Sequence, residues 1–134
     1  MTDSEPQARA SRYVVVKFGD LHRGETMNIG ILAWDHPIPF NEPPPPETPV
    51  MQRIIEEAEW ARIFEAFPRG YNAELREDVV NRLQAIKTYG DYMHVWNRMG
   101  PYSPFEFTEE RPSVGGAGDL LEAMWKYFFV DRPR

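Results

Sequence analysis

Two runs of β-branched and aromatic residues, separated by only eight residues, most constrain the fold of this chain. The first run extends from Tyr13 to Phe18 and the second from Met27 to Trp34. Branched and aromatic side chains suit a pleated surface, so both runs predict β-strands. Eight residues are too few for a crossover helix. We therefore expect two antiparallel neighbouring strands joined by a hairpin loop.

The composition indicates a folded protein with one domain. The chain has 134 residues, enough for a single ordinary hydrophobic core. Hydrophobic residues make up 42% of the chain and aromatic residues 13%, which is more than a disordered chain carries. Residues 1–10 are polar and lack periodicity. We expect a flexible tail at 1–10 and a single domain at 11–134.

Charge and residue usage argue against several classes of function. The formal net charge is −6 and the basic residues are scattered, so binding to nucleic acid is disfavoured. The chain has no cysteine, which excludes disulfides, thiolate chemistry and cysteine metal sites. No stretch approaches the ~20 apolar residues that span a bilayer. We therefore expect a cytoplasmic protein without a membrane partner.

A proline-rich segment follows the second run. Seven prolines lie between His36 and Pro49, and four of them are consecutive. Because proline fixes φ and has no amide donor, the segment predicts a loop over 36–49 instead of a helix or a paired strand. A polyproline stretch would suit a partner that binds polyproline II helices, but a stiff exposed spacer explains it more simply.

The stretch from Val50 to Phe67 fits two structures. With Thr48 as N-cap and Pro49 at the first helical position, its apolar spacing matches one long helix. Val50 to Ile55 equally fits a third strand, with a shorter helix beginning at about Glu57. Periodicity alone leaves both alternatives open.

The rest of the chain predicts helices and one short strand. Asn72 is placed to cap a helix, Asp91 a second helical segment, and Asp119 a last helix after the flexible 114–118 segment. Phe105 begins a short alternating edge strand. The first of these helices has one apolar face, formed by Leu75, Val79, Leu83 and Ile86. The last has a heavily apolar face, formed by Leu120, Leu121, Met124, Trp125, Phe128 and Phe129.

Together these elements predict an α+β fold. We expect one small antiparallel sheet of three to four strands, with the helices packed on one of its faces.

Most of the chemical motifs in the chain have simpler structural explanations. The glycines at 115–118 precede a helix, but the segment lacks the Lys-Ser/Thr pair of a phosphate-binding loop. No serine or threonine lies in a nucleophile-elbow context. Several polar residues near the first hairpin could offer metal ligands, although loop polarity explains them more simply. These residues are Asp20, His22, Glu25, Asp35 and His36. We therefore predict no catalytic residue, metal site or cofactor.

Arg23, Glu25 and Asn28 are the candidate site residues. Strand alternation would place Asn28 on one face with Gly30, Leu32 and Trp34, and Gly30 would open a gap there. In a functional interpretation, the three polar side chains line a pocket beside this gap. In a structural interpretation they stabilise the turn, and Gly30 lets a neighbouring backbone approach closely. We favour the structural interpretation, because a hairpin needs such residues in any case.

The segments Tyr13 to Phe18 and Arg23 to Leu32 resemble the opening of a family of small bacterial proteins known only as domain of unknown function 3037. Its members typically have a Tyr-led strand, an Arg-Gly-Glu turn and an Asn-Val-Gly-Val strand, which Arg23, Glu25 and Asn28 match in this chain. The resemblance implies a strand followed by a short helix for Val50 to Phe67. It also implies an accessory role, because members tend to be encoded near genes such as those for HipA-like kinases. The proline-rich insertion at 37–49 departs from the family pattern.

Three functional hypotheses follow. The leading one is a non-catalytic bacterial protein of the cytoplasm that binds another protein through Arg23, Glu25, Asn28 and the proline segment. The runner-up is an enzyme or small-ligand protein with a polar pocket at the first hairpin, where Arg23 would hold an anion and Glu25 would act as base or metal ligand. The third and weakest is a regulator that contacts DNA through a local basic patch.

Overall fold

The computed structural model describes residues 10–20, 25–37, 42–66, 73–99, 103 and 105–130; the side chains of residues 20, 25, 26, 63–66 and 130 are not described. The predicted hairpin is confirmed. Strand β1 (Ala10–Asp20) pairs with β2 (Glu25–His36) in antiparallel fashion along its whole length. Both strands are longer than expected, so only residues 21–24 separate them. The first strand begins at Ala10, which is buried and was expected in the tail, whereas residues 1–9 lie outside the described residues.

One irregularity interrupts this long hairpin. Val16 lies opposite Gly30, but the next residue, Lys17, lies opposite Asn28, which leaves Ile29 as an extra residue in β2. This arrangement is a β-bulge. Because successive side chains of a strand alternate between faces, an extra residue exchanges the faces of the residues before and after it.

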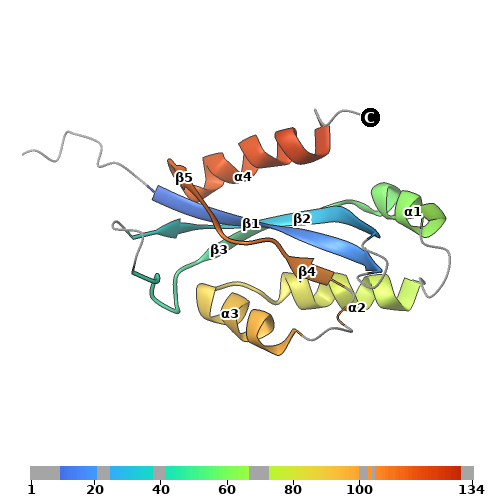
Figure 1. Ribbon diagram of the computed structural model, residues 1–134, viewed down its shortest axis with the longest axis horizontal. Coiled ribbons are helices and arrows are strands. Elements are labelled where there is room, and N and C mark those ends of the chain that lie inside the picture. Colours follow the sequence, from blue (N-terminus) through green and yellow to red (C-terminus); the bar gives the residue numbers. More distant parts are fainter. Residues whose placement is uncertain are drawn as a thin grey trace, which may run out of the picture.

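Three further strands complete an antiparallel sheet. Strand β3 (Val50–Ile54) pairs with β2, whereas β4 (Phe105–Phe107) and β5 (Arg111–Val114) pair with the two ends of β1. The strand order is β3-β2-β1-β4, with β5 also beside β1 (Figure 1). The predicted α+β class with an antiparallel sheet is confirmed, with five strands in place of three to four.

Two helices cover the lower face of the sheet, as oriented in Figure 1: α2 (Ala73–Gln84) and α3 (Tyr89–Arg98). They bury the predicted apolar face of α2 against side chains of both central strands. We call this the lower core; its buried residues include Val14, Val16, Phe18, Leu32, Trp34, Val79 and Leu83.

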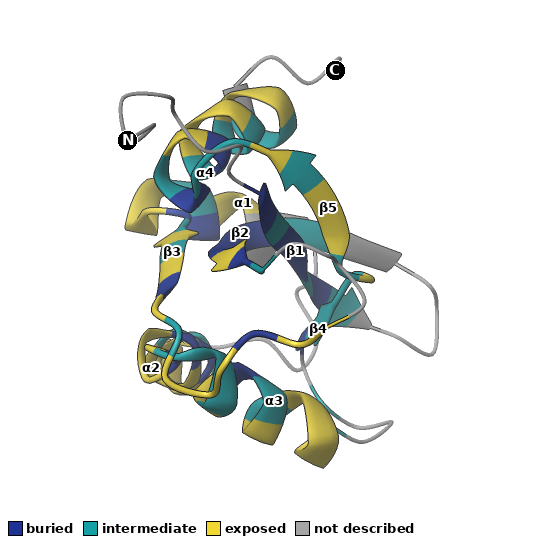
Figure 2. Cartoon of the chain, turned by 90° about the vertical axis from the view of Figure 1, so that its left-hand side faces the viewer, coloured by how far each residue is buried: buried dark blue, intermediate teal, exposed yellow. Residues whose placement is uncertain are grey.

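The last helix, α4 (Ala117–Trp125), covers the upper face and continues into a π-helical turn, η1 (Lys126–Val130). Figure 2 shows the buried central strands between α4 on one side and α2 and α3 on the other. The helices therefore lie on both faces, not on one face as expected, because β1 and β2 are apolar on both sides. The upper core consists of Tyr13, Val15, Ile31, Ala33, Ala117 and Leu120.

The strand-then-helix alternative for the stretch that begins at Val50 is confirmed. Strand β3 is followed by α1 (Glu57–Ala66), while Phe67 lies outside the described residues. Trp60 of α1 is only 2% exposed and meets Phe18 edge-on, with ring centroids 5.8 Å apart. This contact anchors α1 to the lower core.

Two of the predicted helix caps are wrong. Helix α3 is capped by Thr88, and Asp91 completes a capping box from inside the helix. Helix α4 has Gly116 at its N-cap, and Asp119 lies in its first turn. The cap of α4 comes instead from Asp35 of β2, whose carboxylate accepts a 3.0 Å hydrogen bond from the backbone N–H of Ala117. The predicted cap Asn72 lies outside the described residues.

The described part of the proline-rich segment is a structural connection. The carbonyl of Pro46 accepts a 2.8 Å hydrogen bond from the backbone N–H of Gly90, and the carbonyl of Thr48 accepts one of 2.8 Å from Tyr89. A Cβ atom at Gly90 would lie 3.1 Å from the Pro46 oxygen, so glycine permits this close approach. Residues 42–49 therefore hold the start of α3, and His36, expected in the loop, ends β2.

Candidate functional site

The structure places the three candidate side chains unequally. Arg23 lies outside the described residues, and Glu25 is described only by its backbone, which pairs with Asp20 at the end of the hairpin. Asn28 is fully described, is half-buried in β2 and lies opposite Lys17. The functional interpretation, in which all three side chains line one pocket, therefore stays a prediction. Asn28 is the candidate residue whose surroundings the structure describes.

The β-bulge turns Asn28 toward the upper face. Lys17 follows Val15 at a spacing of two in β1, and Val15 belongs to the upper core, so Lys17 and its partner Asn28 face α4. Leu32 and Trp34 belong to the lower core. The prediction that Asn28 shares their face is wrong, because Ile29 is an additional residue between them and Asn28.

Gly30 has the structural role that was proposed for it. A Cβ atom at this position would lie 3.0 Å from the backbone oxygen of Arg53 and 3.6 Å from the Cα atom of Ile54. Glycine therefore lets the backbone of β3 pack closely against β2. It opens no gap beside Asn28, because the two residues face opposite sides of the sheet.

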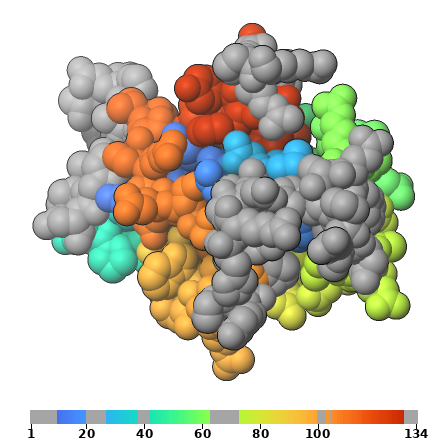
Figure 3. Space-filling view, turned by 45° about the vertical axis from the view of Figure 1, so that its right-hand side comes forward, coloured from blue at the N-terminus to red at the C-terminus, as the bar shows by residue number. Residues whose placement is uncertain are grey.

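Asn28 lines an open cavity with a volume of about 450 Å³. The cavity lies where the beginning of β2, the end of β3, the beginning of α1 and the π-helical turn η1 meet. Figure 3 shows atoms of β2, in light blue, directly beneath the red atoms of the last helix, with α1 in green beside them. We call it the Asn28 cavity; its lining residues are Met27, Asn28, Arg53, Ile54, Ile55, Glu56, Ala58, Glu59, Trp125 and Phe129.

A stacked pair of aromatic rings forms one wall of the Asn28 cavity. The rings of Trp125 and Phe129 are 4.1 Å apart between centroids and only 16° from parallel. Trp125 ends α4, and Phe129 lies in η1, so the π-helical turn carries the second ring. π-Helical turns are rare and are frequently found at functional sites.

Arg53 extends from β3 over this wall. Its guanidinium carbon lies 4.3 Å from the centroid of the Trp125 ring, a cation–π contact. Arg53 is solvent-exposed, and it forms no hydrogen bond through its side chain and no ion pair with any other described residue. The guanidinium is thus oriented by the indole, while its N–H donors make no hydrogen bond to a described residue.

The carboxamide of Asn28 likewise has no hydrogen-bond partner within the described part of the chain. Of the two carboxylates at the cavity, Glu59 forms a 3.4 Å ion pair with Arg62, whereas Glu56 forms none with a described residue. Three polar groups with free hydrogen-bonding capacity therefore line the same cavity: the side chains of Asn28, Arg53 and Glu56.

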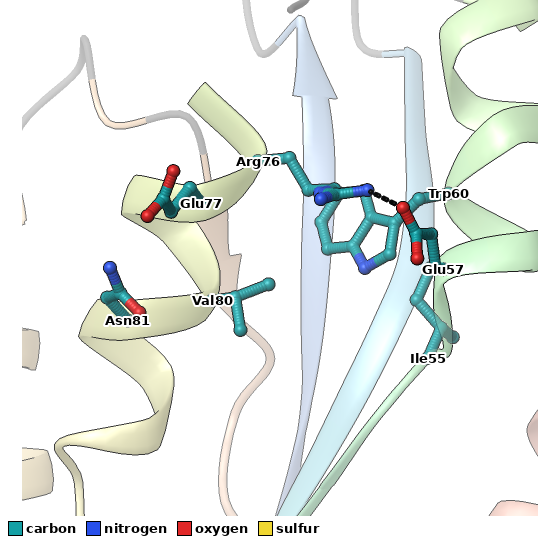
Figure 4. Close-up of a pocket in the computed structure, with 7 residues that line it drawn as sticks. All are labelled: Ile55, Glu57, Trp60, Arg76, Glu77, Val80 and Asn81. Carbon is teal, nitrogen blue, oxygen red and sulfur yellow. Dashed lines mark hydrogen bonds and ion pairs between the residues drawn. The ribbon is translucent and has the colours of Figure 1, made fainter. Parts of the chain in front are cut away.

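A second, smaller cavity of about 230 Å³ lies between α1 and α2. Figure 4 shows Arg76 reaching from α2 to Glu57 at the start of α1, with Trp60 behind the pair. The two side chains form a 3.2 Å ion pair. This pair uses Arg76, the one cation among the lining residues, so the polar side chains that remain for a ligand are those of Glu77 and Asn81, without a positive charge among them.

A buried polar cluster lies elsewhere, between β1 and α3. Arg12 forms a 3.7 Å ion pair with Glu110. Burial, followed by the negative charge of Glu110, raises the pKa of Tyr89, and the same two causes raise that of Tyr92. Both phenols therefore stay neutral at physiological pH. The rings of Tyr89 and Tyr92 also pack on Trp34, at centroid distances of 5.3 and 5.0 Å, so this cluster contributes to the lower core.

The polar residues that were considered as possible metal ligands do not gather among the described residues. No group of three or more His, Asp or Glu side chains in the described ranges is arranged to hold a metal ion. Asp35 is used as the cap of α4. Asp20, His22 and Glu25 have no described side chains, so their part of the prediction is not tested.

Sequence reasoning missed Arg53 and assigned Trp125 and Phe129 to an apolar helix face without a site. One signal was available, since Arg53 interrupts an apolar strand at a position that faces the upper side of the sheet. No helix in the described part of the chain is both long and apolar enough to cross a membrane.

Comparisons with protein-family models, curated proteins and solved structures gave no match for this chain.

Proposed function

We propose that this protein is a non-catalytic binding protein and that its ligand is a small organic molecule held in the Asn28 cavity. The observation that carries the proposal is that Asn28 and Arg53, both without a polar side-chain partner among the described residues, line one open cavity with a stacked aromatic wall. Small-molecule sites typically combine apolar walls with a few converging polar groups. Their volumes run from about 300 to 1,000 Å³, and the Asn28 cavity lies within this range.

The chemistry of Asn28 and Arg53 favours binding over catalysis, and of the other lining residues only the carboxylates Glu56 and Glu59 belong to a class that serves as general base. A carboxamide donates and accepts hydrogen bonds but does not titrate, and a guanidinium keeps its protons throughout the physiological range. Neither group can act as a general acid or base. We therefore assign Asn28 and Arg53 to orienting a ligand, and we retain Arg23 and Glu25 as further candidate contacts because they closely precede Asn28 in the sequence.

A thermal-shift screen tests this proposal. Wild-type protein would be heated with amino acids, carboxylic acids, amines, nucleotides and inorganic anions. A compound present at 100 times its Kd adds about 2.7 kcal/mol to the stability, which raises the melting temperature by several degrees. Asn28→Ala should abolish the shift, whereas Asn97→Ala, which changes an exposed amide on α3, should preserve it.

The same compound should be tested with Arg23→Ala and Glu25→Ala, since loss of the shift in either variant would extend the site to the hairpin loop. If no compound in the set stabilises the wild type, or if Asn28→Ala responds as the wild type does, the proposal is wrong.

A second candidate is the cytoplasmic protein-interaction module suggested by the resemblance to domain of unknown function 3037. Exposed large side chains support it, above all Trp96, which is 50% exposed on the outer side of α3. The described prolines support it less, because residues 42–49 hold the start of α3. An affinity capture from bacterial lysate should retain a protein with the wild type that is lost with Trp96→Ser; equal capture by both would contradict this candidate.

A further inference from the structure

We infer that the ligand of the Asn28 cavity is a small zwitterion with an apolar body, of the chemical class of the apolar α-amino acids. This inference rests on the proposed function. It assigns a carboxylate of the ligand to Arg53, an ammonium group to Glu56, and the apolar body to the wall formed by Trp125 and Phe129.

Arg53 provides the position for the carboxylate. A guanidinium that lies against an aromatic ring keeps its N–H donors at its edge, where they fit a carboxylate in a two-pronged arrangement. Arg53 lies 4.3 Å from the Trp125 ring centroid and has no acidic partner among the described residues, although Glu56 and Glu59 line the same cavity. A ligand carboxylate would supply the partner that the protein does not.

Glu56 provides the position for the ammonium group. It follows Arg53 by three residues, at the turn from β3 into α1, and its carboxylate has no cationic partner among the described residues. Glu59, the other carboxylate at the cavity, already pairs with Arg62. The cavity thus offers one unpaired positive and one unpaired negative side chain that do not pair with each other.

The charge balance of the site favours a zwitterion over a dianion. A second negative charge on the ligand would meet Glu56 and Glu59, and like charges in one site are destabilising. The whole chain, with a net charge of −6, adds to this repulsion. A ligand with one charge of each sign satisfies both Arg53 and Glu56 without leaving an excess charge in the cavity.

The remaining lining fits the apolar body of such a ligand. Met27, Ile54 and Ile55 join the two aromatic rings in lining the cavity. Asn28 adds a carboxamide that can donate to a carboxylate or accept from an ammonium group. The apolar lining is expected to select for the side chain, and the polar groups for the backbone-like end of an amino acid.

The test measures binding of L-phenylalanine and L-leucine by isothermal titration calorimetry, together with two blocked analogues. N-acetyl-L-phenylalanine lacks the ammonium charge, and L-phenylalaninamide lacks the carboxylate. We expect each blocked analogue to bind wild-type protein at least about tenfold more weakly than L-phenylalanine does, which corresponds to about 1.4 kcal/mol per lost charge contact.

Two variants assign each charge to its residue. Arg53→Gln should weaken the binding of L-phenylalanine about tenfold without further weakening the binding of L-phenylalaninamide. Glu56→Gln should weaken the binding of L-phenylalanine about tenfold without further weakening the binding of N-acetyl-L-phenylalanine. Arg98→Gln, which changes an exposed arginine in the last turn of α3 outside the cavity, should bind all compounds as the wild type does. Melting temperatures without ligand identify any variant that fails to fold, in which case the neutral Arg53→Met replaces Arg53→Gln.

The outcomes separate this inference from the proposed function. The inference of a zwitterionic ligand is wrong if both blocked analogues bind as tightly as L-phenylalanine. It is also wrong if a compound with a single charge binds through Asn28 while amino acids do not. In either case the proposed binding function is still supported. If no compound in the screen binds at all, both are wrong.

Discussion

At the scale of single residues, one extra residue decides which way a candidate side chain points. Ile29 is unpaired in the bulge of β2, and it turns Asn28 toward the upper face, where the cavity lies. Gly30, directly after the bulge, lets β3 come close enough to place Arg53 at the same cavity. Asn28 and Gly30, the two residues that look anomalous in this strand, therefore have different roles: Asn28 lines the site, and Gly30 allows the close packing of β3 on β2.

We predict that Gly30→Ala destabilises the protein and weakens ligand binding. The new Cβ atom would lie 3.0 Å from the backbone oxygen of Arg53, which cannot move without shifting β3. Overpacking of this kind costs about 1–3 kcal/mol. The matched control is Gly118→Ala in α4, where the Cβ atom would meet only the flexible Met51 side chain, at 3.6 Å, and where alanine favours the helix by up to about 1 kcal/mol.

Urea denaturation of both variants measures these differences. A Gly30→Ala protein as stable as the wild type would show that the approach of β3 to β2 is looser than described.

The carboxylate of Asp91 makes stability depend on pH in acid. The backbone N–H of Lys87, which donates to it at 3.1 Å, is the main cause that lowers its pKa, and the backbone N–H and hydroxyl of Thr88 add to this. Because the folded pKa is below the ordinary value of 3.8, the stabilisation is present above that value and is lost as the pH falls through the folded pKa.

We therefore predict that Asp91→Asn lowers the melting temperature at pH 7 and that its difference from the wild type shrinks as the pH falls below about 4. Thermal melts between pH 2 and pH 7 measure it, with the exposed Glu109→Gln as a control for loss of one charge. A difference that stays constant over this range would contradict the role of the ionised carboxylate.

At the scale of elements, helix ends are fixed by groups from other parts of the chain. Helix α3 has its own capping box, but the proline-rich segment also holds its first turn through the carbonyls of Pro46 and Thr48. Helix α4 has no cap from its own sequence and takes one from Asp35 of β2. Each contact ties a helix to a distant segment, so the helix cannot slide along the sheet.

We predict that Asp35→Ala destabilises the protein by about 1 kcal/mol, the usual cost of losing an N-cap. Asp119→Ala, in the first turn of the same helix, should cost less, because this carboxylate caps no backbone group and acts only on the helix dipole. Urea denaturation of the two variants compares these costs. A larger loss of stability for Asp119→Ala than for Asp35→Ala would mean that Asp119 is the cap of α4, as the sequence predicted.

At the scale of the whole molecule, the sheet is shared between two cores. Val14 and Val16 of β1 face the lower core, while Tyr13 and Val15 of the same strand face the upper core. The same alternation holds in β2 beyond the bulge. Neither core can lose its packing without disturbing the strands that support the other, so the two cores should unfold together.

We predict that Leu120→Ala, a change in the upper core, lowers the stability by about 2–5 kcal/mol and leaves a single unfolding transition. Leu120 is 5% exposed and packs against the upper face of the sheet. Tryptophan fluorescence, recorded in a Trp96→Phe and Trp125→Phe background so that only the buried Trp34 and Trp60 of the lower core contribute, and far-ultraviolet circular dichroism should show the same midpoint. Midpoints that separate in the variant would mean that the two cores unfold independently.

The sequence by itself determined the local structure of this protein. The β-branched and aromatic residues of 13–18 and 27–34, with the short connection between them, predicted the hairpin, three- and four-residue spacing from Leu75 predicted α2, and the apolar residues from Leu120 onward predicted the last helix. These patterns are readable because burial repeats with the period of each element. For the stretch after Val50, where both periods fit, only the resemblance to a family pointed to the strand that the structure has.

Tertiary structure alone decided the direction of Asn28, the division of helices between two faces, the cap of α4 and the Asn28 cavity. One extra residue reverses a strand's faces without changing its composition, so periodicity does not reveal it. Asp35 and Ala117, or Asn28 and Trp125, are too far apart in sequence for any local pattern to relate them. Asp35 and Ala117 share a hydrogen bond, and Asn28 and Trp125 line one cavity, because the folded sheet brings β2, β3 and the last helix together.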